Sequence, residues 1–205
     1  MSLFAHLQPL TTNLDPATVV QGYAASFFPM AELDGTIYWH SPDPRAIIPL
    51  DNIRVSRSLR KTIERGTFEI RLDTSFPEVI RACCERRETW ISDEIIRTYS
   101  ELHSMGFAHC VESWQDGELV GGLYGVSIGG AFFGESMFSR VSDASKVAFV
   151  SLAAHILSRG FILLDTQYIN PFTEQLGALE ISRNEYLMLL QCAVQLPVSF
   201  HHPQD

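Results

Sequence analysis

Apolar residues along this chain fall into two kinds of segment, short extended runs and stripes with helical spacing. Three extended runs, at 107–114, 118–127 and 131–138, follow one another in the central part. Asp116-Gly117 and Gly129-Gly130 separate them, and both pairs favour tight hairpin turns. We therefore expect an antiparallel meander of three strands in the middle of the chain.

A regular helical stripe follows the meander. It begins after Ser142-Asp143, ends at Gly160 and contains Phe149, Leu152, Ala153, Ile156 and Leu157. An apolar run at 161–166 comes directly after it. Because a helix between two apolar strands is typical of a crossover, we expect the strand at 161–166 to lie parallel to the last strand of the meander.

Residue types that favour helix starts predict five further helices. These starts are Asp15-Pro16, Ser56, the capping box Ser75-x-x-Glu78, Ser92-Asp93-Glu94 and the capping box Ser182-x-x-Glu185. Extended segments are predicted at 36–39, 46–50, 68–72 and 196–200, and the last of them could return to the sheet. The chain thus predicts an α+β fold with a mixed sheet, divided near residue 66 into a small N-terminal domain (1–66) and a larger domain (67–205).

The order of elements in the larger domain fits the fold of acetyl-CoA-dependent N-acetyltransferases. Those enzymes bind the CoA pyrophosphate on a Gly-x-Gly loop before the central helix. Here residues 139–144 read Ser-Arg-Val-Ser-Asp-Ala, which offers no comparable nest of backbone amides. We therefore expect that the chain does not use CoA.

Three polar residues mark the best candidate site. Glu135 interrupts an apolar strand, where a charge is costly unless it has partners or a task. The structural alternative is a carboxylate satisfied by the backbone or by Arg140. Asp165 and Gln167 are two residues apart in a strand, so both point to the same face. Because Gln can accept a hydrogen bond from an amine but is no strong base, a reaction with an amine nucleophile fits this set.

Composition and charge narrow the class of protein. The formal net charge of −9 argues against indiscriminate nucleic-acid binding, yet the basic residues concentrate before residue 100. Four of them fall near one face of the helix after Ser56: Arg57, Arg60, Lys61 and Arg65. This face is either simply solvated or contacts phosphates, and the sequence leaves both readings open.

The sequence also argues against a membrane span, a secretory signal, a serine nucleophile and a metal site. No apolar run approaches the roughly 20 residues that a membrane span needs, and the N-terminus has no secretory signal pattern. The cysteine spacing suits core thiols in a reducing cytosol, so we expect a cytoplasmic protein. No serine lies in a nucleophile elbow. His103, His109 and His155 form no pair with metal-ligand spacing, so no metal site is expected.

Short motifs over most of the chain resemble the leucyl/phenylalanyl-tRNA–protein transferase family. They are Ser41-Pro-Asp-Pro-Arg45, Thr89-Trp-Ile91, Leu102-His103 with Gly106, Val120-Gly-Gly-Leu-Tyr-Gly-Val126, Gly134-Glu-Ser-Met-Phe-Ser-Arg140, Ala144-Ser-Lys146, Asp165-x-Gln167 and Leu176-Gly-Ala178. Each motif is weak alone, but the ordered set is highly specific.

The resemblance implies a bacterial cytosolic enzyme of the N-degron pathway. Such enzymes move Leu or Phe from aminoacyl-tRNA to the α-amino group of proteins that begin with Arg or Lys. The tRNA ester is already an activated acyl donor, so no cofactor is implied. The family's fold, a small N-terminal domain packed on an N-acetyltransferase-like domain, agrees with the division near residue 66.

The family's motifs also imply roles for single residues. Gln167 would receive or orient the acceptor amine, Asp165 would tune Gln167, and Glu135 would hold the aminoacyl end of the donor. The positions that match the family's apolar pocket are Leu123, Phe132, Met137 and Leu164. The positions that would contact the tRNA are Trp90, stacked on the terminal adenosine, and Arg57, Arg60, Lys61 and Arg65, at acceptor-stem phosphates.

Some positions depart from the family pattern. Met30 and His40 stand where the family has tryptophans, and Thr166 stands where it has cysteine. The tryptophan replacements bear on donor affinity and adenine stacking more than on the chemistry. Two other functions stay open: the same fold with a different aminoacyl or amine substrate, and a non-catalytic module that binds aminoacyl-tRNA.

Overall fold

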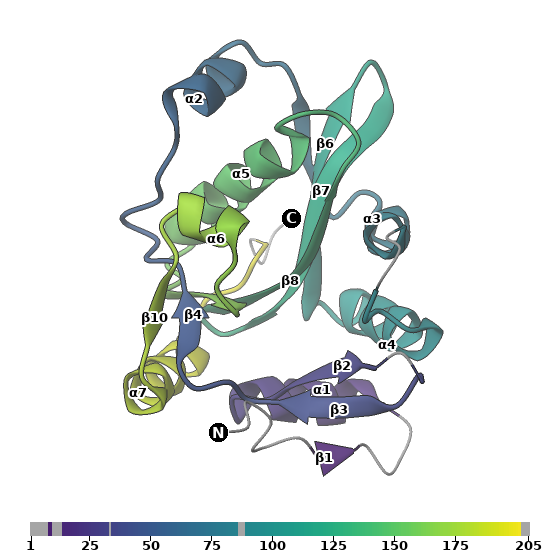
Figure 1. The fold of residues 1–205 in the computed structure, drawn as a ribbon, viewed down its shortest axis with the longest axis vertical. Helices are drawn as coiled ribbons and strands as arrows, with labels where there is room; N and C mark the ends of the chain where they lie inside the picture. The colour runs from purple at the N-terminus through teal and green to yellow at the C-terminus, as the bar shows by residue number, and fades with distance from the viewer. Residues whose placement is uncertain (1–7, 10–13, 33, 86–88, 202–205) are drawn as a thin grey trace.

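The computed structural model describes residues 8–9, 14–32, 34–85 and 89–201, and the structural statements below concern these residues. They form two sheets (Figure 1). The smaller has the strand order β1 (Gln8–Pro9), β3 (Ile37–His40), β2 (Phe28–Ala31). The larger has the order β10 (Leu179–Ile181), β4 (Arg45–Ile47), β9 (Leu163–Gln167), β8 (Ala131–Ser139), β7 (Glu118–Ile128), β6 (Ala108–Gln115), β5 (Glu69–Leu72).

The predicted meander and crossover are confirmed. Strands β6, β7 and β8 pair antiparallel, and β8 pairs with β9 in parallel across helix α5 (Ala144–Ser158). Asp116 and Gly117 have φ values of 53° and 82°, the left-handed conformation that a tight hairpin turn requires at both central positions. A mixed sheet with helices on both faces is the α+β fold expected from the order of elements.

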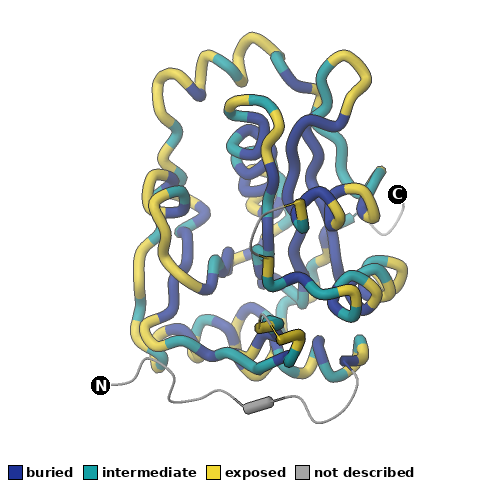
Figure 2. The backbone as a smooth tube through the Cα atoms, turned by 45° about the vertical axis from the view of Figure 1, so that its right-hand side comes forward, coloured by how far each residue is buried: buried dark blue, intermediate teal, exposed yellow. Residues whose placement is uncertain are grey.

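Neighbouring residues of each central strand face opposite sides of the large sheet. Phe133 and Leu163 belong to one hydrophobic cluster, while Phe132 and Leu164, one residue away, belong to a second. The first cluster is covered by α1 (Pro16–Ala24), α3 (Phe76–Cys84), α4 (Asp93–Ser104) and α7 (Arg183–Val194). The second is covered by α5. The sheet is therefore a central layer, and Figure 2 shows its middle strands buried along most of their length.

Two short helices lie outside these layers. Helix α2 (Arg57–Glu64) buries only Leu59 and sits at the end of the molecule opposite the small sheet (Figure 1). Ser56 caps it as predicted, by accepting a hydrogen bond from the backbone N of Leu59 at 3.2 Å. Helix α6 (Pro171–Gln175) follows β9. None of the helices in the described residues has the length and apolar character of a membrane span.

Three sequence predictions are wrong in detail. Ser75 makes no side-chain cap at the start of α3, and its backbone N–H, which Glu78 would accept in a capping box, instead donates to the buried carboxylate of Glu112 at 2.8 Å. Leu157 is 48% exposed, since it lies about 80° around the helix from Phe149, at the edge of the stripe. The segment at 196–200 does not return to the sheet.

The division of the chain at residue 66 stays a prediction. Strand β4 belongs to the large sheet, where it pairs with β9 and β10. The boundary between the two sheets therefore falls between His40 and Arg45, upstream of the predicted one.

Candidate active site

A pocket lies where strands β8 and β9 stop pairing. Their parallel pairing extends from Ala131 and Leu163 to Phe133 and Asp165. The residues that follow in both strands, from Gly134 in β8 and from Thr166 in β9, line a cavity of about 240 Å³. Because the strands no longer bond to each other here, their polar ends can face a ligand.

Glu135 reaches this pocket through a β-bulge. Gly125 of β7 pairs with Gly134, whereas Tyr124 pairs with Ser136, so Glu135 is the extra residue in β8. A side chain on Gly125 would place its Cβ 2.3 Å from the carbonyl oxygen of Phe133, so only glycine fits opposite the bulge. The carboxylate points toward Tyr23 of helix α1 and Tyr99 of helix α4.

Glu135 is held by hydroxyl and amide donors. Its Oε1 accepts hydrogen bonds from Tyr23 Oη at 2.5 Å and from Gln167 Nε2 at 2.7 Å. Tyr99 Oη lies 3.4 Å from Oε2 and 2.6 Å from the Tyr23 hydroxyl. Burial raises the pKa of Glu135 to about 8, and the nearby Asp165 carboxylate contributes in the same direction. The carboxyl therefore exchanges its proton close to neutral pH.

Asp165 is a buried carboxylate with a buried counter-charge. Arg45 Nε lies 3.0 Å from Oδ1 and Arg45 Nη2 lies 2.7 Å from Oδ2, and both side chains are at most 1% exposed. Tyr186 Oη donates to Oδ2 at 2.7 Å. Burial alone would lower the pKa of Arg45, but Asp165, together with Tyr186 and Tyr23, more than offsets burial, so the net shift of the pKa is upward. The guanidinium also lies 4.7 Å from the ring centroids of both Phe28 and Tyr186.

Gln167 connects the two carboxylates. Its backbone N donates to Asp165 Oδ1 at 2.8 Å, and its side-chain amide donates to Glu135 Oε1. It ends β9 with a φ of 64°, which is uncommon for a residue other than glycine. With the NH₂ group directed at Glu135, the amide carbonyl oxygen is left as an acceptor. The structure thus brings together the three polar residues predicted from the sequence.

The four predicted apolar residues lie in one cluster, but only two reach the pocket. Leu123 and Met137 line it, together with Phe149 and Leu152 of helix α5. Phe132 and Leu164 are 0% and 1% exposed and lie in the same cluster without lining the pocket. The pocket thus has an apolar wall opposite its polar groups.

Trp90 and Met30 line the same pocket. The two segments are joined by a hydrogen bond from the backbone N of Ala31 to the carbonyl oxygen of Trp90, at 3.2 Å. The pocket is thus built from both sheets, because Met30 belongs to β2. Tyr124 also lines it, and the Tyr124 hydroxyl is buried without a hydrogen-bond partner among the described residues.

The basic residues predicted to contact tRNA lie apart from the pocket lining. All four are exposed on or directly after helix α2, and none forms an ion pair with another described residue: Arg57, Arg60, Lys61 and Arg65.

Arg140, the partner that the structural alternative gave to Glu135, instead bonds Glu85 at 3.0 Å. The alternative in which Arg140 satisfies the Glu135 carboxylate is therefore wrong.

Several residues of the site were not singled out from the sequence. Tyr23, Tyr99 and Tyr186 carried no local signal, because each comes from a helix that approaches the sheet only in the folded chain. Arg45 stood within the quoted Ser41-Pro-Asp-Pro-Arg45 motif, but nothing in the sequence paired it with Asp165, 120 residues away.

The solved structures that align with this chain are distant. A GCN5-related N-acetyltransferase-like protein from Streptococcus suis aligns over 67% of this chain and 58% of its own, with a TM-score of 0.37 and 13% identity. L-PGS from Bacillus licheniformis aligns over 78% of this chain and 53% of its own, with a TM-score of 0.43 and 12% identity.

Sequence relatives are close and cover nearly the whole chain. Proteins named leucyl/phenylalanyl-tRNA–protein transferase from Herpetosiphon aurantiacus and Gloeobacter violaceus are 57% and 55% identical over 192 residues, which is 93% of this chain and 100% of each relative. One from Chlorobaculum tepidum is 51% identical over 89% of this chain and 96% of its own. The model of the leucyl/phenylalanyl-tRNA protein transferase family matches residues 47–191, and that of its N-terminal domain matches residues 12–43. With the motifs at Glu135 and Asp165 in place, the chain belongs to the leucyl/phenylalanyl-tRNA protein transferase family.

Proposed function

We propose that this chain transfers Leu or Phe from aminoacyl-tRNA to the α-amino group of proteins that begin with Arg or Lys. The observation that carries the proposal is the pocket between β8 and β9, which has an apolar wall and a Glu135–Gln167 pair. An aminoacyl ester needs both features, one for its side chain and one for its polar reacting end. Family membership supports the same reaction.

The apolar wall suits the side chain of Leu or Phe. A cavity of roughly 150 Å³ lined by apolar side chains holds benzene, so the 240 Å³ here accommodates a phenyl or isobutyl group with room for the ester. Met137 is flexible and adapts to either shape. A side chain branched at Cβ would be bulkiest nearest the ester, so we expect Val and Ile to fit less well.

The reaction needs positioning more than a strong base. The acceptor amine attacks the ester carbonyl carbon, an amide bond forms, the ester C–O bond breaks, and the ribose hydroxyl of the terminal adenosine leaves with the proton that the amine gives up. The carbonyl oxygen of Gln167 would accept a hydrogen bond from the amine. Asp165 and Arg45 would fix Gln167 in this orientation through its backbone N. Glu135, with a pKa of about 8, is suited to hold a proton in transit.

The donor would bind through its phosphates and its terminal adenosine. Four exposed cations on and directly after α2, which form no ion pair with the rest of the described chain, are available for acceptor-stem phosphates, and Trp90 offers an aromatic face beside the pocket. The N-terminal domain, predicted as residues 1–66, would thus contribute to tRNA binding. Because the ester is already activated, the reaction consumes neither CoA nor ATP. Aminoacyl-tRNA and new protein N-termini share the bacterial cytoplasm, and we place the enzyme there.

Two alternatives are kept. The same site could accept another aminoacyl group or a small amine, but a polar donor would need hydrogen-bonding groups where Leu123 and Met137 stand. A non-catalytic module would bind aminoacyl-tRNA without forming product.

A transfer assay separates these functions. The purified chain is mixed with labelled Leu-, Phe- or Val-tRNA and with peptides beginning with Arg, Lys or Gly. We expect label on the Arg and Lys peptides, from Leu and Phe donors alone. Gln167→Ala should abolish transfer, whereas Gln175→Ala, in an exposed turn of α6, should not. Label on the Gly peptide or from Val-tRNA would favour other substrates, and bound tRNA without product would favour the binding module.

A further inference from the structure

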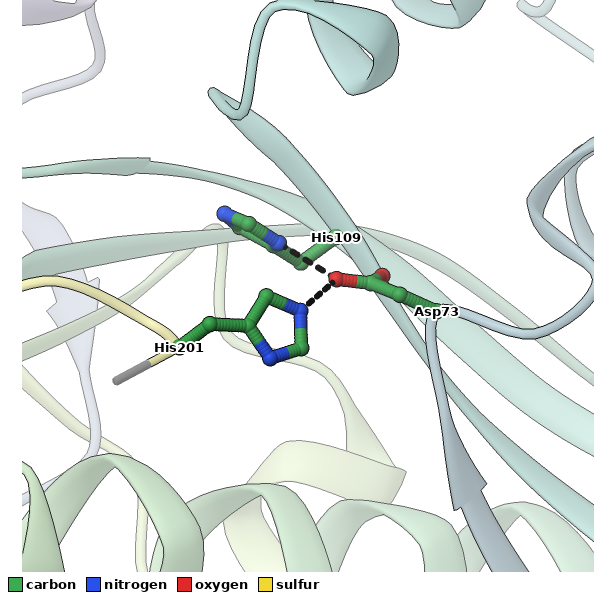
Figure 3. A group of neighbouring side chains, drawn as sticks. All are labelled: Asp73, His109 and His201. Carbon is green, nitrogen blue, oxygen red and sulfur yellow. Dashed lines mark hydrogen bonds and ion pairs between the residues drawn. The ribbon is translucent and has the colours of Figure 1, made fainter. Parts of the chain in front are cut away.

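Three side chains from distant parts of the chain bring their ligand atoms to one point. Asp73 follows β5, His109 lies in β6, and His201 is the last described residue (Figure 3). His109 Nδ1 and His201 Nε2 each lie 2.6 Å from the same oxygen, Asp73 Oδ2, and the three ligand atoms all lie within 4.8 Å of one another. None of the three residues lines the pocket around Glu135. The group is therefore distinct from the candidate active site.

His109 is held in the tautomer that a metal ligand requires. Its Nε2 lies 3.1 Å from the carbonyl oxygen of Gly106, which can only accept, so Nε2 carries a proton. In a neutral imidazole, Nδ1 then directs a lone pair at Asp73 Oδ2. Two lone pairs at 2.6 Å need a proton or a cation between them. A ring oriented by a backbone carbonyl is also the usual arrangement behind a metal-bound histidine.

Asp73 is also oriented by a backbone hydrogen bond. Its Oδ1 accepts a hydrogen bond from the backbone N of Cys110 at 2.6 Å, which leaves Oδ2 for the two rings. The group thus presents one carboxylate oxygen to two imidazole nitrogens.

We propose that Asp73, His109 and His201 bind a divalent metal ion of the zinc type, with a water molecule in the fourth position. Two imidazoles and one carboxylate suit Zn²⁺, whereas Mg²⁺ and Ca²⁺ prefer oxygen ligands throughout. Metal–ligand bonds of about 2.0–2.2 Å in tetrahedral geometry would open the 2.6 Å contacts to about 3.3 Å. The side chain of His201 is 42% exposed, so it can move this far and admit the water.

The metal would fasten the C-terminal segment to the sheet. Phe200 is 1% exposed and stacks on the His109 ring, with 4.1 Å between centroids. Its carbonyl oxygen lies 2.8 Å from His155 Nε2 in α5. A metal bound by His201 would fix the segment 196–201 between α5 and the β5–β6 edge. The site is therefore structural, and transfer activity is not expected to depend directly on it.

The test uses the full-length chain stripped of metal with a chelator and then titrated with Co²⁺ or Zn²⁺. We expect one equivalent of Co²⁺ to give the visible absorption bands of a tetrahedral ion and to be displaced by Zn²⁺. Zn²⁺ at 100 times its dissociation constant should raise the midpoint of thermal unfolding by roughly 5–10 °C, and Mg²⁺ should not.

His201→Ala should weaken Zn²⁺ binding at least tenfold. The matched control is His155→Ala, which removes a histidine that contacts the same segment but not Asp73, and it should bind Zn²⁺ like the wild type. No cobalt bands and no zinc-dependent shift in the wild type would overturn the proposal and leave an ion-paired hydrogen-bonded cluster. Unchanged binding by His201→Ala would also overturn it, since the metal would then lie elsewhere. If His201→Ala does not fold, the wild-type titrations decide alone.

Discussion

Replacement of Glu135 by glutamine should remove a large part of the pH dependence of stability. The unfolded carboxyl loses its proton near pH 4.5, whereas the folded one keeps it until about pH 8. Between these values the folded state binds more protons than the unfolded state, so stability falls as pH rises. Below the window both states are protonated and the contribution is fully present; above it both are ionised and the contribution is lost.

The size of the effect follows from the width of that window. Each unit of pKa difference corresponds to 1.36 kcal/mol, so a pKa raised from 4.5 to about 8 changes the free energy of unfolding by about 5 kcal/mol across the window. Glutamine has the same shape, and its amide oxygen can accept the hydrogen bonds that Tyr23 and Gln167 donate to Oε1. Relative to the wild type, the free energy of unfolding of the variant should therefore rise by about 1.4 kcal/mol for each pH unit within the window.

The assay is urea unfolding of wild type and Glu135→Gln at pH 5, 6, 7, 8 and 9. Glu118→Gln, which removes an exposed carboxylate at the start of β7, measures how much of any change follows from net charge alone. Tyr23→Phe removes a donor that favours the ionised form, so it should extend the upper end of the window to higher pH. Parallel curves for wild type and Glu135→Gln between pH 5 and 8 would refute the reasoning.

Three further predictions concern the ion pair, the basic helix and the apolar wall. Arg45→Met leaves a buried carboxylate without its counter-charge and should cost about 3–5 kcal/mol in urea unfolding; a loss below 1 kcal/mol would contradict the buried pair. Arg57→Glu with Lys61→Glu should weaken tRNA binding alike for different tRNA bodies and reduce the slope of log K against log salt by about 2; an unchanged slope would remove α2 from the interface. Met137→Glu places a second carboxylate in the pocket and should abolish Leu and Phe transfer with an unchanged circular dichroism spectrum, whereas Met188→Glu, at a 62% exposed site, should transfer normally.

The parts of the fold that were predicted correctly depend on local chemistry. Asp15, Ser56 and Ser92 each accept a hydrogen bond from the backbone N three residues later, so the helix starts are set within one turn of chain. The Asp116-Gly117 turn likewise needs only two residues of suitable conformation. Such signals can be read from the sequence because no distant residue competes with them.

Distant partners account for the failures. Ser75 has the residue type of a cap, yet at the start of α3 its backbone N–H donates to Glu112 in β6, a contact between positions 37 residues apart. The ion pair of Arg45 with Asp165 joins positions 120 residues apart, and the group around Asp73 joins positions up to 128 apart. Each depends on which strands become neighbours, and spacing along the chain carries no information about that.

The bulge at Glu135 shows how a single extra residue changes which side chains of β8 share a face of the sheet. Strict alternation along β8 would put Phe132 and Met137, which are an odd number of positions apart, on opposite faces of the sheet. The extra residue changes the alternation, so both belong to the cluster under α5, while Glu135 points to Tyr23. Glu135 shares its face with Phe133, two positions earlier, so the local distortion accounts for the place of Met137 in the apolar wall. We expect that a regular β8 would turn Met137 away from Phe132 and out of the apolar wall, even though every side chain of the pocket were kept.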